Sequence, residues 1–310
     1  MTKTVTFRRR SLRSRLHQCW PLYLFLVVPL LYLAVMQYYP MYGAQIAFRR
    51  FRASLGITGS PWVGFDNFIR FFNDYQFTRI IVNTLVISFY TLFVSFFTRI
   101  ILALSINSVR SKYYQKPVQM ITYMPHFIST VVMVGIIVQF FNPRLGIIAR
   151  ILAPFGVTRD LTGVPAAFSH IYVWSGVWQS TGWGTIVFLA ALAGVDPNLH
   201  EAAICDGATR LQRIWLIDLP AIFPVAAIML ILDAGRVMSL GFEKVYLMQN
   251  SLNISASQVI STYVYMVSLG SGRPDFSYGA AIGLFNSVVN FILVLTVNSI
   301  TKKLNQSSLW

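Results

Sequence analysis

Charged side chains are scarce in this chain of 310 residues, and six of them are concentrated in one segment, residues 196–220. They are Asp196, Glu201, Asp206, Arg210, Arg213 and Asp218. The chain contains no G-x-x-x-x-G-K-[ST] phosphate-binding sequence, no His/Cys cluster with metal-ligand spacing and no nucleophile–base constellation. Long apolar runs flank the segment on both sides. The pattern therefore predicts a polar contact with a partner in water, and neither catalysis nor metal binding.

The same segment carries helix start and stop signals. Asp-Pro at 196–197 combines a capping acceptor with a ring whose fixed φ suits a first helical turn, which predicts a helix over 199–206. Gly207 permits a turn that a Cβ would obstruct. Apolar residues at helical spacing predict a second short helix over 209–215, and Pro220 is expected to end it.

The segment resembles the EAA loop of bacterial ABC importer permeases. Seven residues carry the resemblance at fixed spacing: Glu201, Ala202, Ala203, Gly207, Ile217, Leu219 and Pro220. Asp206 stands directly before the glycine. In that family the loop, here 195–220, is cytoplasmic, and its first helix docks in a groove of the ATPase subunit. The alternative is an ordinary amphipathic surface loop.

The resemblance implies a role for each motif residue. Glu201 would make the polar contact to the ATPase, Ala202 and Ala203 would allow close approach, and Gly207 would set the angle between the two helices. His200 departs from the pattern, because tyrosine or another residue that packs on the ATPase is expected there. We expect His200 to suit a particular ATPase partner.

The resemblance also implies a complex. Its other members would be a second homologous permease, two ATPase subunits and an external solute-binding protein. ATP and Mg would be bound by the ATPase, and this chain would bind no cofactor and catalyse no reaction itself. The complex would lie in the bacterial inner (cytoplasmic) membrane.

The composition is that of an integral membrane protein. The chain is 55% hydrophobic and only 11% charged, against about 25% charged residues in soluble proteins, and its mean hydropathy is +0.60. The net charge of +15 comes from basic residues dispersed among apolar ones, so we assign it to the flanks of membrane spans and not to nucleic acid. The two cysteines form neither a disulfide framework nor a metal site.

The predicted fold is all-α, with six transmembrane helices and both termini cytoplasmic, as in the transmembrane domain of a type I ABC importer. Residues 1–19 hold six basic residues and no acid, which indicates a cytoplasmic arm by the positive-inside rule. Residues 20–310 would form one transmembrane domain. Its predicted spans are 21–39, with a kink at Pro29, and 80–106, 118–141, 167–193, 221–240 and 278–300.

Polar and aromatic residues within the fourth span are candidates for a substrate path. Trp174 and Trp178 lie one turn apart, where indole faces can stack on a sugar ring, and Gln179 can bond its hydroxyl groups. The alternative is an aromatic belt combined with helix packing through nearby glycines.

Charged and amide residues in the fifth and sixth spans are further path candidates. Asp233 and Arg236 at i, i+3 either neutralise each other or line a hydrated path, since charges in a membrane must be paired or face water. Asn286 and Asn290 share one face of the last span and serve either helix packing or the path.

Two other polar residues fall inside predicted spans. Arg99 is expected to extend its side chain toward the cytoplasmic surface. His126 follows Pro125, and packing beside a proline kink is favoured over a proton relay.

Three stretches resemble a narrower group, the carbohydrate-uptake permeases related to the maltose importer, and within it those for pectin- and alginate-derived oligosaccharides. They are 124–130 (MPHFIST), 241–250 (GFEKVYLMQN) and 307–310 (SSLW). An acidic oligosaccharide would suit Arg236 and the arginine-rich loop after the first span. The rival function is an ion-coupled secondary transporter that uses Asp233 and Arg236. An intramembrane enzyme would need paired acids or a metal motif within spans, and we find none.

Overall fold

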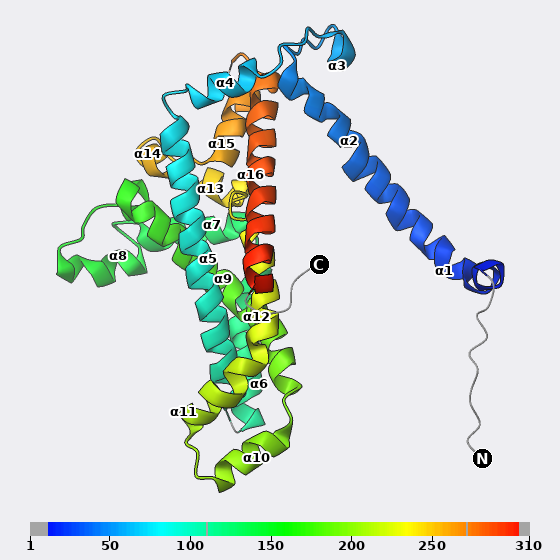
Figure 1. Cartoon of the computed structure of the whole chain (residues 1–310). Coiled ribbons are helices and arrows are strands. Elements are labelled where there is room, and N and C mark those ends of the chain that lie inside the picture. Colours follow the sequence, from blue (N-terminus) through cyan, green and yellow to red (C-terminus); the bar gives the residue numbers. More distant parts are fainter. Residues whose placement is uncertain (1–11, 110, 271, 304–310) are drawn as a thin grey trace.

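The computed structural model describes residues 12–109, 111–270 and 272–303. Over these ranges the chain is helical, with two isolated β-bridges and no strand (Figure 1). Long helices form an elongated bundle, with α10 at one end and α4 at the other. The main long helices are α5 (Phe77–Asn107), α9 (Pro165–Ala193), α12 (Leu219–Ala234) and α16 (Phe276–Lys303).

Four helical stretches are long and apolar enough to cross a membrane, and the number rises to five if one bent pair counts as a span. The four are Tyr23–Phe48, Phe77–Asn107, Arg210–Ala234 and Phe276–Lys303. With its 29 residues, α9 extends about 43 Å at 1.5 Å per residue, enough to cross a bilayer. Its tryptophans, serines and glutamine make it less apolar than the four stretches above, so it is not counted among them. The count of six spans stays a prediction.

The N-terminal helix runs apart from the bundle (Figure 1). It comprises α1 (Leu12–Leu33), the π turn η1 (Ala34–Tyr38) and α2 (Tyr39–Met41), and 3₁₀ turns over Tyr42–Phe48 lead to the α4 end. No residue described between Trp20 and Met41 is buried. α1 is continuous through Pro29, and the kink predicted there stays a prediction. Residues 1–11 of the predicted basic arm, and the 307–310 motif, lie outside the described residues, and 12–19 belong to α1.

The span predicted over 118–141 is not one continuous helix but is broken near the predicted proline kink. The chain forms α6 (Lys112–Tyr123), a 3₁₀ turn (Met124–Phe127) and α7 (Thr130–Phe141), and the two halves meet at 100°. Pro125 has no N–H to continue the hydrogen-bond ladder of α6, and Ile128 and Ser129 adopt extended backbone. The Ser129 side chain accepts a hydrogen bond from the Val132 N–H, which starts α7 afresh.

Short helices cover the sides and the α4 end of the bundle. They are α3 (Gly56–Gly59), α4 (Asp66–Phe72), α8 (Ile147–Leu152), α13 (Phe242–Met248), α14 (Ile254–Ser257) and α15 (Ile260–Tyr265). The segment between α12 and α16 folds back into the bundle, as Asn253, Ser257 and Val259 are fully buried.

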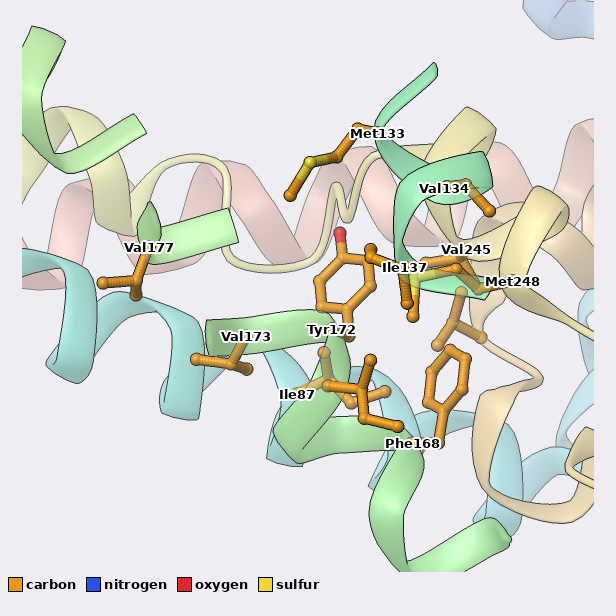
Figure 2. Close-up of a cluster of buried hydrophobic side chains, with 12 residues drawn as sticks. Ile87, Met133, Val134, Ile137, Phe168, Tyr172, Val173, Val177, Val245 and Met248 are labelled. Atoms are coloured by element: carbon orange, nitrogen blue, oxygen red, sulfur yellow. The ribbon is translucent and has the colours of Figure 1, made fainter. Parts of the chain in front are cut away.

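Three apolar clusters form the core. The first joins α5, α7, α9 and α13; Figure 2 shows Phe168 and Tyr172 of α9 close to Ile137, Val245 and Met248. The second lies at the α4 end around Phe71 and Tyr278. The third lies nearer α10 and packs α5, α9 and α12 together. Each cluster therefore ties α5 or α9 to helices from the other half of the chain.

A partly buried carboxylate joins three elements at the α4 end. Asp74 Oδ2 accepts hydrogen bonds from the Tyr263 hydroxyl at 2.6 Å and the Tyr278 hydroxyl at 2.8 Å, and Oδ1 accepts from the Gln76 N–H. Burial by itself raises the pKa of Asp74, but these three hydrogen bonds and the charge of Arg70 outweigh it, so the pKa is lowered. The ionised carboxylate therefore stabilises the native state.

We expect Asp74→Asn to lower the free energy of unfolding by about 1–3 kcal/mol, the range for hydrogen bonds to a charged group. Because the native pKa is depressed, the wild-type contribution is complete above the carboxyl's unfolded pKa and is lost as the pH falls through the lower native value. Thermal unfolding in detergent between about pH 7 and 3 checks this. The difference between wild type and variant should shrink in acid; a difference that stays constant would contradict the assignment.

Candidate functional site

The segment 196–220 forms two short helices around a glycine turn, as predicted. The first, α10 (Pro197–Cys205), is capped by Asp196, whose side chain accepts from the Asn198 N–H at 3.0 Å. Gly207 has φ +77°, a conformation that favours glycine, and the following Ala208 N–H donates to the Ala203 carbonyl at 2.8 Å. The turn angle is therefore set by local backbone hydrogen bonds.

The second helix continues directly into α12. A capping box between Thr209 and Gln212 starts α11 (Arg210–Arg213), and the π turn η6 (Ile214–Asp218) leads on. The predicted stop at Pro220 is wrong, because Pro220 lies inside the first turn of α12. The π turn directly before it provides the irregular hydrogen bonding that a proline inside a helix requires.

The motif residues divide into an exposed set and a packed set. Glu201, Ala202, Asp206 and Gly207 are exposed, and Glu201 makes no hydrogen bond or ion pair to any described residue. Leu219 packs instead on the apolar cluster of α5, α9 and α12, which includes the fully buried Phe188. The exposed end of the segment is thus free for a partner, and its other end is built into the core.

His200 does not face outward as the resemblance led us to expect. Its Nε2 lies 3.3 Å from Oδ1 of Asp218, whose side chain is only 6% exposed. The Asn107 amide at the end of α5 donates to the same oxygen at 3.4 Å. These groups line a polar cavity of about 390 Å³ together with Glu201 and Arg213. The sequence signal for this junction was Asp218 itself, an acid at the start of an apolar run.

A second polar cavity, of about 190 Å³, lies between α5, α9 and the end of α12. Its polar lining includes Ser88, Ser95, Arg99, Asp233, Arg236 and Ser239. Arg99 Nη1 donates to Asp233 Oδ2 at 2.7 Å, and both side chains are mostly buried. The expected extension of Arg99 toward the cytoplasmic surface is therefore wrong, and of the two interpretations of Asp233 and Arg236, mutual neutralisation is wrong. Gly184 makes room for Arg99, since a Cβ there would come within 2.7 Å of its side chain.

Arg236 also lines this cavity but, unlike Arg99, its side chain has no acidic partner among the described residues. α12 ends at Ala234, so Arg236 lies beyond the helix. It is exposed, and its side chain makes no hydrogen bond or ion pair to any described residue. Asn290 reaches the cavity rim, where its Oδ1 accepts from the Met238 N–H and its Nδ2 donates to Ser239. Asn286 lies one turn away, and its Oδ1 is buried without a partner. Arg236 is the charge in this cavity most available to a ligand.

The tryptophans line a different cavity. Trp174 and Trp178 border an almost wholly apolar space of about 510 Å³ between α7, α8 and α9. Trp174 donates to the Tyr90 hydroxyl at 2.9 Å. Gln179 is engaged in structure, donating to the Ile128 carbonyl at 2.8 Å across the break before α7. The structure therefore groups Asp233, Arg236 and Asn290 but separates them from Trp174, Trp178 and Gln179.

Two further side chains clarify what this region contains. The His126 ring stacks on Trp183 with centroids 4.7 Å apart, as the packing interpretation predicted. Lys244 of α13 is buried, donates to the Tyr172 carbonyl at 3.0 Å and lies over the Tyr172 ring; sequence reasoning missed it because a short helix after α12 gave no sign of burial. No group of three His, Cys, Asp or Glu able to hold a metal occurs among the described residues.

The fold and the segment at 196–220 can now be compared with known proteins. The family described as binding-protein-dependent transport system inner membrane component matches residues 99–306. The chain belongs to this family. It is a transport permease subunit with the fold of a type I ABC importer permease, and the family's description places it in the inner membrane.

Relatives match over almost the whole chain. Protein LplB of Bacillus subtilis (strain 168) is 43% identical over 296 residues, which cover 93% of this chain and 91% of the relative. The polygalacturonan/rhamnogalacturonan transport system permease protein YteP of the same organism is 38% identical, over 98% of this chain and 94% of its own.

Solved structures agree with these matches. A chain of a bacterial ABC transporter involved in the import of the acidic polysaccharide alginate superposes with a TM-score of 0.85 at 38% identity, covering 94% of this permease and 98% of that chain. A chain of the bacterial alginate transporter in complex with an alginate pentasaccharide-bound periplasmic protein gives 0.87 at 35% identity, over 97% and 100%.

Removing one member of the Arg99–Asp233 pair should be more harmful than removing both. We expect Asp233→Leu to lower the free energy of unfolding by about 3 kcal/mol, because it leaves a mostly buried guanidinium without its acid. Arg99→Met combined with Asp233→Leu should recover most of that loss. Thermal unfolding in detergent of wild type, both single variants and the double variant measures the interaction. Additive single effects would show that the pair is not coupled.

Proposed function

We propose that this permease forms half of the translocation path of an ATP-driven, binding-protein-dependent oligosaccharide importer. The observation behind the proposal is the form of the segment 196–220. Its exposed helix α10 carries Glu201, whose side chain has no partner among the described residues, and its other end packs into the core through Leu219. A segment that protrudes from a membrane bundle and leads directly into one of its spans can transmit motion from a partner to that span.

The partner at this end would be an ATPase. In the proposed complex α10 docks on the ATPase, Glu201 makes the polar contact, Ala202 and Ala203 permit close approach, and Gly207 holds the angle to α11. ATP and Mg would be bound there and not by this chain. ATP-driven closure would move the two permeases' coupling loops together and open the path on the α4 side, and hydrolysis would reset it.

Two further partners are proposed for the surfaces of the bundle away from α10. A second, homologous permease would pack against this one. The α4 end would face the external solute-binding protein, which delivers the substrate; the alginate transporter structure includes such a protein with its pentasaccharide.

The proposed substrate is an oligosaccharide with acidic groups. The named substrates of the similar proteins, polygalacturonan/rhamnogalacturonan and alginate, support the class. Within this chain, support comes from the cavity in which Arg236 is exposed and unpaired beside hydroxyl and amide groups, a suitable setting for carboxylate and sugar hydroxyls. Asn286 and Asn290 would complete its rim. Trp174, Trp178 and Gln179 are not part of this cavity.

The arginines of the first outer loop contribute less than the sequence suggested. Arg49 donates to the Thr58 and Ser60 carbonyls, and Arg70 pairs with Asp275. The rival function, an ion-coupled transporter using Asp233 and Arg236, lacks a free acid, since Asp233 is engaged by Arg99.

Glu201→Ala tests the coupling contact. We expect the variant complex, reconstituted in lipid with partner permease, ATPase and binding protein, to lose most of the ATPase stimulation that binding protein plus oligosaccharide gives the wild type. The reason is the loss of a charged contact at the centre of the proposed interface. Altering the partner permease's loop in parallel separates a redundant contact from a wrong assignment. Full stimulation with both loops altered would overturn the proposal.

Arg236→Gln tests the acidic substrate. We expect transport of a galacturonate or mannuronate oligosaccharide to fall about tenfold, as expected for loss of one charge-assisted contact, while a neutral oligosaccharide of equal length is unaffected or improved. Arg150→Gln, at the exposed α8, is the matched control for loss of one arginine. Equal effects on charged and neutral substrates would contradict the assignment.

A further inference from the structure

The junction around Asp218 joins three elements near the α10 end of the bundle. His200 comes from α10, Asp218 from the π turn before α12, and Asn107 from the end of α5. Distances of 3.3 Å and 3.4 Å bring the imidazole and the amide to the same carboxylate oxygen. A single buried carboxylate therefore connects the exposed helix to two bundle helices.

Apart from this junction, α10 is connected to α12 through a stretch of chain that can act as a hinge. Between them lie the glycine turn at Gly207, the short α11 and the π turn, all of which are irregular or short. A force on α10 would bend the chain at such points unless a second contact braced it. The His200–Asp218 contact bridges these irregular points and closes α10 back onto the start of α12.

We propose that His200 and Asp218 are positioning residues that make α10, α12 and α5 move together, so that the tightness of coupling between ATP hydrolysis and transport depends on this pair. The inference rests on the proposed function, because it presumes that α10 receives motion from an ATPase. The inference goes beyond the proposed function because it assigns the transmission of motion to two residues outside the EAA motif.

Other charged groups surround the pair. Arg213 adds positive charge near Asp218, Glu201 and Arg210 line the same cavity, and Asn107 is neutral. A buried carboxylate is stable only with hydrogen-bonding or charged partners, so loss of His200 would leave Asp218 poorly satisfied.

The test measures substrate transported per ATP hydrolysed, in the complete complex in proteoliposomes with binding protein and an acidic oligosaccharide. We expect His200→Leu, which leaves Asp218 with the Asn107 amide alone, to lower this ratio roughly tenfold, within the range typical of coupling between sites, while the ATPase remains bound. His200→Gln keeps an N–H donor of similar reach. It should retain most of the wild-type ratio, a rescue that a loss of bulk alone would not give.

Matched controls keep the outcomes distinct. His126→Leu removes a histidine that stacks on Trp183 away from the junction, and should leave the ratio unchanged. If His200→Leu transports as much per ATP as wild type while Glu201→Ala uncouples, the inference about the pair is overturned and the proposed function stands. If Glu201→Ala has no effect even with the partner loop altered, the proposed function falls and this inference with it. A His200→Gln ratio as low as that of His200→Leu would overturn the assignment of the His200 side chain as a hydrogen-bonding partner of Asp218.

Discussion

In the hydrocarbon of a bilayer, backbone N–H and C=O groups must find partners within the protein, and this constraint governs every interruption in the helices. Pro40 and Pro220 each follow a π turn by two residues, at 34–38 and 214–218, so the irregular hydrogen bonding precedes the proline in both helices. The 100° break before α7 is closed by side chains, with Gln179 donating to the Ile128 carbonyl and Ser129 capping the new helix. Some polar side chains that the sequence alone presents as possible substrate contacts, such as Gln179, therefore bind backbone groups instead.

A second constraint concerns charge. The carboxylate Asp233, near the end of α12, binds Arg99 of α5, and Asp218, at its start, binds Asn107 at the end of α5. α12 is therefore fixed to α5 at two levels. Because α12 continues from the exposed α10 segment, the same helix connects the contact with a water-soluble partner to the polar cavity around Arg236.

Local patterns were predicted well and long-range ones poorly. The helix–glycine–helix form of 196–220 depends on neighbours in sequence, and the structure confirms it, down to the positive φ of Gly207. The Arg99–Asp233 pair spans 134 positions, so no local pattern could reveal it, and the i, i+3 spacing of Asp233 and Arg236 pointed to the wrong partner because α12 ends between them. Trp174 and Trp178 do share a face, but periodicity cannot say which cavity that face borders.

The distance between Arg99 and Asp233 along the chain has a consequence for biogenesis. During synthesis α5 leaves the ribosome well before α12, so its arginine reaches the membrane with no acid to neutralise it, a state that costs several kcal/mol in lipid. We therefore expect α5 to stay in a hydrated or protein-lined setting, such as the insertion machinery, until α12 arrives. The two helices would then enter the lipid as a neutral pair, so the position of one salt bridge along the chain would set the order of release from the translocon.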